Sequence, residues 1–101
     1  MESEVICGGM NKNELPADAA IQELADKVRA FVEEKSGRKF TEFKAITYCT
    51  QLVAGMNYFI KVCVGTNDYI MLRIYRNLDQ EVTLTSYQLD KKDNDPIEYF
   101  Q

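Results

Sequence analysis

Histidine is absent from this chain of 101 residues, and its absence excludes much catalytic chemistry. Without it, neither a Cys-His nor a Ser-His nucleophile pair can be built within the chain. A zinc site would need cysteine or carboxylate ligands alone, and Cys7, Cys49 and Cys63 do not have metal-ligand spacing. Glycine-rich phosphate loops are missing as well. We therefore expect no enzyme activity, no metal and no cofactor.

Long apolar runs and basic clusters are also missing. Without a stretch of about 18 apolar residues we expect no membrane partner, and a net charge of −4 without a Lys/Arg cluster argues against nucleic acid. The acidic N-terminal residues lack the apolar core of a secretory signal. An odd, sparse set of cysteines is not a disulfide framework. The missing secretory signal and the sparse cysteines together favour unpaired thiols in the cytoplasm, although a mature secreted chain would also lack its signal.

The length of the chain predicts a single domain over residues 1–101. Apolar residues make up 46% of the chain and are spread along it, so this domain can bury a core. Residues 1–15 form an arm in which Gly8 and Gly9 allow a sharp bend. The alternative is an ordinary frayed terminus.

An amphipathic helix is predicted over residues 18–36. Its single apolar stripe follows helical spacing and contains Ile21, Leu24, Ala25, Val28 and Val32, widened by Phe31. Asp18 is suited to cap the start and Gly37 to end the helix. Glu33 and Glu34 are neighbours that point apart, so they indicate a solvated face and not a catalytic pair.

From Phe40 onward the apolar period changes to two, which predicts strands. We expect strands over residues 42–51, 56–64, 69–76 and 82–89, turns at 65–68 and 77–80, and a polar loop at 90–96. Ile97, Tyr99 and Phe100 would tie the C-terminal segment to the body. Short links demand antiparallel pairing, so residues 40–101 predict a meander and the whole chain an α+β fold with the helix packed on the sheet.

Two strand connections carry exposed apolar residues. Residues 51–56 present Leu52, Val53 and Ala54 where hairpin turns are usually polar, which suggests a partner surface. The alternative is a bent strand with Val53 in the core. Leu78 is a weaker case, because an isolated exposed leucine is ordinary. Alternate connections of a meander lie at one end, so both turns and the arm could form one wedge.

The sequence Gln51-Leu52-Val53-Ala54-Gly55 fits the Q-x-V-x-G signature of cystatins, and the following Met56 to Val62 resembles the next strand of stefins. The two glycines of the arm, Ala25-Asp26-Lys27-Val28 in the helix, Phe43-Lys44-Ala45 and Tyr87-Gln88 fit as well. The chain therefore resembles a stefin-type cystatin over nearly its whole length. This resemblance implies an antiparallel sheet of about five strands wrapped around one helix, with the first strand just before the helix.

The resemblance also implies a function. It is reversible, tight-binding, competitive inhibition of papain-like cysteine proteases such as cathepsins L, S, H and B. A wedge of arm and two hairpins would fill the active-site cleft. The implied contact residues are Ile6, Cys7, Gly8, Gly9, Gln51, Leu52, Val53, Ala54, Gly55, Leu78 and Asp79. Either Gly8 or Gly9 matches the arm glycine. The second hairpin is shorter than in stefins, lacks their proline and adds Asp79, so its contribution is in question.

Two alternatives accompany this interpretation. The shortened second hairpin would suit a cystatin-like interaction module that no longer inhibits. The chain is expected to act as a monomer, while long strands beside an apolar hairpin also allow a domain-swapped dimer without inhibitory activity.

Overall fold

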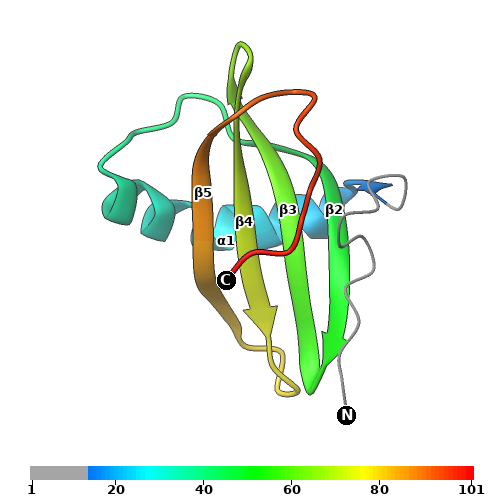
Figure 1. Cartoon of the computed structure of the whole chain (residues 1–101). Coiled ribbons are helices and arrows are strands. Elements are labelled where there is room, and N and C mark those ends of the chain that lie inside the picture. Colours follow the sequence, from blue (N-terminus) through cyan, green and yellow to red (C-terminus); the bar gives the residue numbers. More distant parts are fainter. Residues whose placement is uncertain (1–13) are drawn as a thin grey trace.

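The structure, a computed structural model, describes residues 14–101. Its elements, in chain order, are β1 (Leu15–Pro16), α1 (Ala19–Ser36), β2 (Lys44–Val53), β3 (Gly55–Gly65), β4 (Asp68–Arg76) and β5 (Val82–Lys91). The strands form an antiparallel sheet in sequence order. Helix α1 lies across one face, and the C-terminal segment crosses the other (Figure 1). The predicted α+β fold, a five-stranded sheet around one helix, is confirmed.

Helix α1 begins and ends where its capping residues predict. The Asp18 carboxylate accepts a hydrogen bond from the Ile21 amide at 3.0 Å, and Gly37 ends the helix in the left-handed region at φ 76°. The predicted stripe is buried, with members Ile21, Leu24, Ala25, Val28 and Val32. Phe31 is an exception, because 54% of it is exposed. It lies beside the stripe, where the helix surface already turns toward solvent.

The period-two pattern divides the apolar residues between the two faces of the sheet. On the helix side, Ile60 and Leu72 pair across β3 and β4 and lie in the main core with the helix stripe. On the outer side, Phe59 and Met71 form a second, smaller cluster with Cys49 and Ile97. Both faces of the central strands are therefore covered, although only one helix is present among residues 14–101.

The C-terminal segment is tied to the body, as the sequence predicts, and the structure shows that it covers the outer face of the sheet (Figure 1). Ile97 is buried and Phe100 packs against the same cluster. Lys61 is buried and its ammonium donates to the carbonyl oxygens of Asp93 at 2.5 Å and Asp95 at 2.6 Å. A buried cation is tolerated here because these two oxygens replace its water. The polar loop is thereby held down by a side chain that alternation places on the outer face.

Arg73 fixes the segment further along. Its guanidinium lies over the rings of Phe59 at 5.5 Å and Tyr99 at 5.1 Å. It also donates to the Phe100 carbonyl at 2.8 Å. Cation–π stacking and a charged hydrogen bond thus act on the same few residues, which explains why a segment without regular structure stays on the sheet.

The short strand β1 joins the sheet just before the helix, as the resemblance implied. Leu15 pairs with Tyr48, and Pro16 pairs with Thr47. Glu14, immediately before it, accepts one hydrogen bond from the Thr47 hydroxyl and one from the Ile97 amide, both at 2.8 Å. One carboxylate therefore connects the end of the predicted arm, strand β2 and the C-terminal segment.

The cysteines differ from the prediction. Cys63 carries a free thiol, whereas Cys49 is disulfide-bonded. The expectation of three unpaired thiols is therefore wrong for Cys49. Counting and spacing in a sequence cannot show which cysteines the fold brings within bonding distance. The cysteines consequently give no support to a reducing compartment.

Candidate functional site

The first hairpin, residues 51–57 between β2 and β3, is tighter than the sequence suggested. Val53 pairs with Gly55, so Ala54 alone lies outside the two strands. The strands stay paired to the end because Val53 is β-branched and favours extended backbone. Leu52 is 66% exposed, Ala54 is exposed and Val53 is half-buried. The hairpin therefore ends in a narrow apolar edge, and Val53 does not lie in the main core.

Gly55 is required at this turn for two separate reasons. Its φ of +108° lies outside the range that residues with a Cβ readily adopt. A Cβ here would also lie 2.5 Å from the Arg76 carbonyl oxygen and 3.1 Å from the Cα of Asn77. The first hairpin therefore packs directly on the backbone where β4 ends.

Gln51 lies beneath the tip and not on its surface. Its side-chain oxygen accepts a hydrogen bond from the side-chain amide nitrogen of Asn57 at 2.8 Å. Gln51 is 8% exposed and Asn57 6% exposed. A buried amide pair of this kind is costly to break, because each partner would be left unsatisfied. Gln51 is therefore suited to fix the shape of the hairpin, while Leu52 and Ala54 offer the exposed surface.

The second hairpin, residues 77–81 between β4 and β5, is organised by Asn77. The Asn77 side-chain oxygen accepts from the amides of Asp79 and Glu81, both at 2.9 Å. The Asn77 amide donates to the Glu81 carbonyl at 2.9 Å, which closes the loop. Leu78 is 75% exposed at the loop end, with Asp79 exposed beside it. The short loop thus has a defined shape that presents one apolar side chain.

The two hairpins lie at the same end of the sheet, as predicted from the meander (Figure 1). The close approach of Gly55 to Asn77 places their backbones side by side. We call this surface the loop end and define it by Leu52, Val53, Ala54, Leu78 and Asp79. The predicted arm residues Ile6, Cys7, Gly8 and Gly9 lie outside the described residues.

Tyr75 and Asn77 are contributors that the sequence reasoning missed. Tyr75 lies near the end of β4, and its hydroxyl donates to the Ala54 carbonyl. Asparagine at the start of a turn is a known local signal, so Asn77 could have been found from its position. Tyr75 gave no such signal, because its contact depends on the exact register of three strands.

Catalytic features do not gather at the loop end. Among residues 14–101, His, Cys, Asp and Glu form no cluster that could hold a metal ion. Burial, with Asp93 nearby, raises the pKa of Tyr69, which lies at the opposite end of β4. The Phe40 amide, aided by Arg29, lowers the pKa of Glu33 near the end of α1. Both groups are remote from the loop end.

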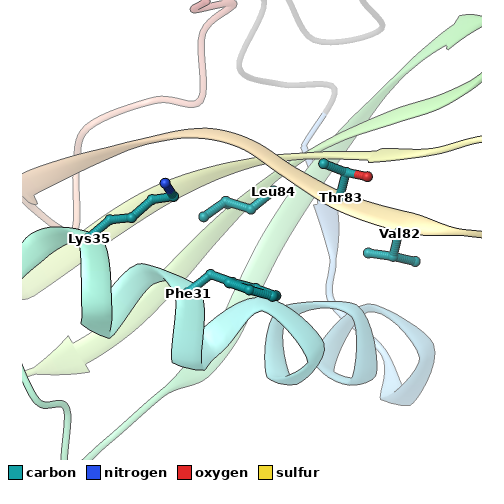
Figure 2. A pocket seen from close by; sticks show the side chains of 5 residues that line it. All are labelled: Phe31, Lys35, Val82, Thr83 and Leu84. Carbon is teal, nitrogen blue, oxygen red and sulfur yellow. The ribbon is translucent and has the colours of Figure 1, made fainter.

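A hollow of about 280 Å³ lies between α1 and the start of β5 (Figure 2). Its lining residues are Phe31, Lys35, Val82, Thr83 and Leu84. The exposed ring of Phe31 belongs here, beside a single cation. Converging polar groups, which a substrate pocket needs for orientation, are not part of this lining.

Within the described part of the chain, no helix has the length and apolar character to cross a membrane.

Comparison with known proteins agrees with this architecture. A family model described as a cystatin domain matches residues 8–94. The chain therefore belongs to the cystatin family, whose members are protease inhibitors and not enzymes.

The similarity extends to particular relatives. The chain is 46% identical to cystatin-B of Bos taurus and 43% identical to cystatin-B of Homo sapiens. Cystatin-B of Ovis aries is 44% identical. Each alignment spans 99 residues, 95% of this chain and 100% of the relative. These similarities place the chain with the stefin type and support cysteine protease inhibition as its activity.

Proposed function

We propose that the protein is a reversible, tight-binding, competitive inhibitor of papain-like cysteine proteases of the cathepsin L, S, H and B type. The observation that carries this proposal is the loop end, where two shaped hairpins with adjacent backbones each present an exposed leucine, Leu52 and Leu78. Burying the apolar side chains of a preformed, protruding edge in a cleft favours binding. Because the edge is already ordered, little entropy is lost on binding.

The small residues at the first hairpin suit the region around a catalytic thiol. Ala54 and Gly55 allow the inhibitor backbone to approach the cleft closely, with Leu52 and Val53 beside them. The backbone turns sharply at Gly55 and so does not run through the cleft as an extended substrate would. We therefore propose that inhibition is steric, with the hairpin excluding substrate and no covalent bond formed.

The arm would contribute the third part of the wedge. We propose that Ile6 and Cys7 occupy the non-primed subsites, and that Gly8 or Gly9 gives the bend that leads them there. Glu14 supports this assignment, because its two hydrogen bonds fix the end of the arm that joins the body. Asp79 and Leu78 would touch the primed side through a loop that Asn77 keeps short and ordered.

Titration of papain with the purified full chain tests the proposal. We expect stoichiometric inhibition that dilution reverses, and the activity should elute with the monomer in gel filtration. A domain-swapped dimer would convert the first hairpin into extended strand and lose inhibition. Absence of inhibition by the monomer at micromolar concentration would instead favour an interaction module that has lost its inhibitory role.

Leu52→Glu separates the loop end from the rest of the molecule. Because Leu52 is 66% exposed, the change should leave the free energy of unfolding within about 0.5 kcal/mol. We expect its affinity for papain to fall at least tenfold, since a charge would be buried in the cleft. Thr66→Glu, at an exposed turn of the opposite end, is the matched control and should inhibit like the parent chain.

The cellular location is a separate proposal. We propose that the protein acts in the cytoplasm, which membership of the stefin type supports. Cell fractionation followed by immunodetection tests this, and recovery only from the medium or from vesicles would contradict it.

A further inference from the structure

Tyr75 makes a contact between the two hairpins. Its hydroxyl donates a hydrogen bond to the carbonyl of Ala54, the single residue outside the strands of the first hairpin. Tyr75 itself belongs to β4, two residues before the second hairpin begins at Asn77. The bond therefore joins the apex of one loop to the base of the other.

The base of the second hairpin, which carries Tyr75, is itself held in place. Arg76 follows Tyr75, and its guanidinium lies 5.1 Å from the ring centroid of Tyr58 and donates to the Tyr58 hydroxyl. Tyr58 is buried in the main core. The Arg76 carbonyl in turn forms the wall that Gly55 approaches closely. The first hairpin thus rests on backbone that the core holds in place.

We infer that Tyr75 is a positioning residue, whose hydroxyl holds Ala54 against the base of the second hairpin so that both apolar apices meet a protease as one rigid body. This inference rests on the proposed function and deepens it. Gly55 has no side chain and Ala54 carries only a methyl group, so neither residue can hold the apex by a polar contact of its own. The Tyr75 hydroxyl therefore supplies a contact that the apex lacks, while the buried pair of Gln51 and Asn57 shapes the strands below it.

The expected effect on binding follows from population arithmetic. If the competent shape of the apex is only partly populated, the apparent dissociation constant rises in inverse proportion to that fraction. One neutral hydrogen bond corresponds to a factor of about three to ten. We therefore expect Tyr75→Phe to weaken inhibition by about three- to tenfold. The ring is retained in this variant, so any apolar contact that it makes with the protease is unchanged.

The test compares Tyr75→Phe with Tyr69→Phe in the full chain. Tyr69 lies on the same strand at the opposite end of the sheet, so its variant makes the same chemical change away from the hairpins. In the free proteins, the carbonyl ¹³C shift of Ala54 and the amide exchange of residues 54–56 report on the apex. Dissociation constants with papain report on the function.

We expect Tyr75→Phe alone to shift the Ala54 carbonyl, to speed exchange at the apex and to weaken papain binding. An unchanged carbonyl shift would overturn the hydrogen bond itself. A changed shift with unchanged affinity would overturn the positioning role. If the parent chain does not bind papain, the proposed function fails, and the spectra of the free proteins still decide whether Tyr75 holds the apex.

Discussion

Single residues at the loop end have roles that their side chains alone do not suggest. Gly55 has no side chain, yet its φ and its distance from Arg76 make it the least replaceable residue of the first hairpin. Gln51, the first residue of the signature, is buried on Asn57. The two ends of the motif therefore shape the hairpin, and the residues between them supply its exposed edge.

Gly55→Ala should destabilise the protein by about 3 kcal/mol, because backbone strain adds to a clash with backbone atoms. Gly37→Ala is the matched control: its φ is +76°, but nothing lies within 4 Å of an added Cβ. We expect the control to cost about 1 kcal/mol, from conformation alone. Urea unfolding measures both, and equal costs would show that the close approach to Arg76 is relieved without penalty.

At the scale of elements, hydrogen bonds join the end of α1 to the segment that connects it to β2. The Glu33 carboxylate accepts hydrogen bonds from the Phe40 amide at 3.0 Å and from Arg29 at 3.3 Å. Both favour the ionised form and lower the pKa of Glu33, the Phe40 amide being the larger cause and burial opposing them. The connection from helix to sheet is therefore held by a group that acid can neutralise.

Glu33→Gln should lower the free energy of unfolding at neutral pH and reduce its dependence on acid. Since the folded pKa lies below the unfolded value near 4.5, the Glu33 contribution is complete above that value and is lost as pH falls through the folded pKa. Urea unfolding between pH 3 and pH 7 measures this. Glu34→Gln, on an exposed neighbour, should parallel the parent curve, and a constant gap for Glu33→Gln would contradict the assignment.

The sequence predicted these elements well wherever local pattern decides the outcome. The helix stripe with its Asp18 and Gly37 caps, and the alternation that places Ile60 and Phe59 on opposite faces, depend on neighbours within a few positions. Phe31 was misplaced, because periodicity locates a face but not the edge of the surface that covers it.

Contacts between distant positions could not be predicted in the same way. The bond of Tyr75 to Ala54 and that of Glu14 to Ile97 require strand register and the path of the C-terminal segment. The disulfide at Cys49 likewise depends on the tertiary structure. For the candidate site, the motif located the first hairpin correctly, and only the structure separated its exposed residues from the buried Gln51.

At the scale of the whole molecule, the sheet is covered on both faces, by α1 and by the C-terminal segment (Figure 1). Lys61 and Arg73 are charged side chains that join the C-terminal segment to the sheet. The loop end thus projects from a body in which apolar packing holds the helix face, and apolar packing together with a buried cation holds the outer face.

Lys61→Met should release residues 92–97 while leaving the helix side intact. Loss of a charged donor to two carbonyls is expected to cost about 2 kcal/mol. Hydrogen exchange should show faster exchange in the C-terminal segment than in α1. Lys92→Met, at an exposed position of the same loop, is the control and should leave both segments unchanged. Uniform loosening of the whole chain would contradict a local role for Lys61.

The covered outer face also bears on how long such an inhibitor would survive among proteases. Proteolysis needs backbone that can leave its surroundings and adopt an extended shape, so irregular segments are usually cut first. Residues 92–101 are irregular, yet Ile97 is buried and Arg73 holds Phe100. The lifetime of the molecule would then be governed by how often this segment detaches, a property separate from the strength of inhibition.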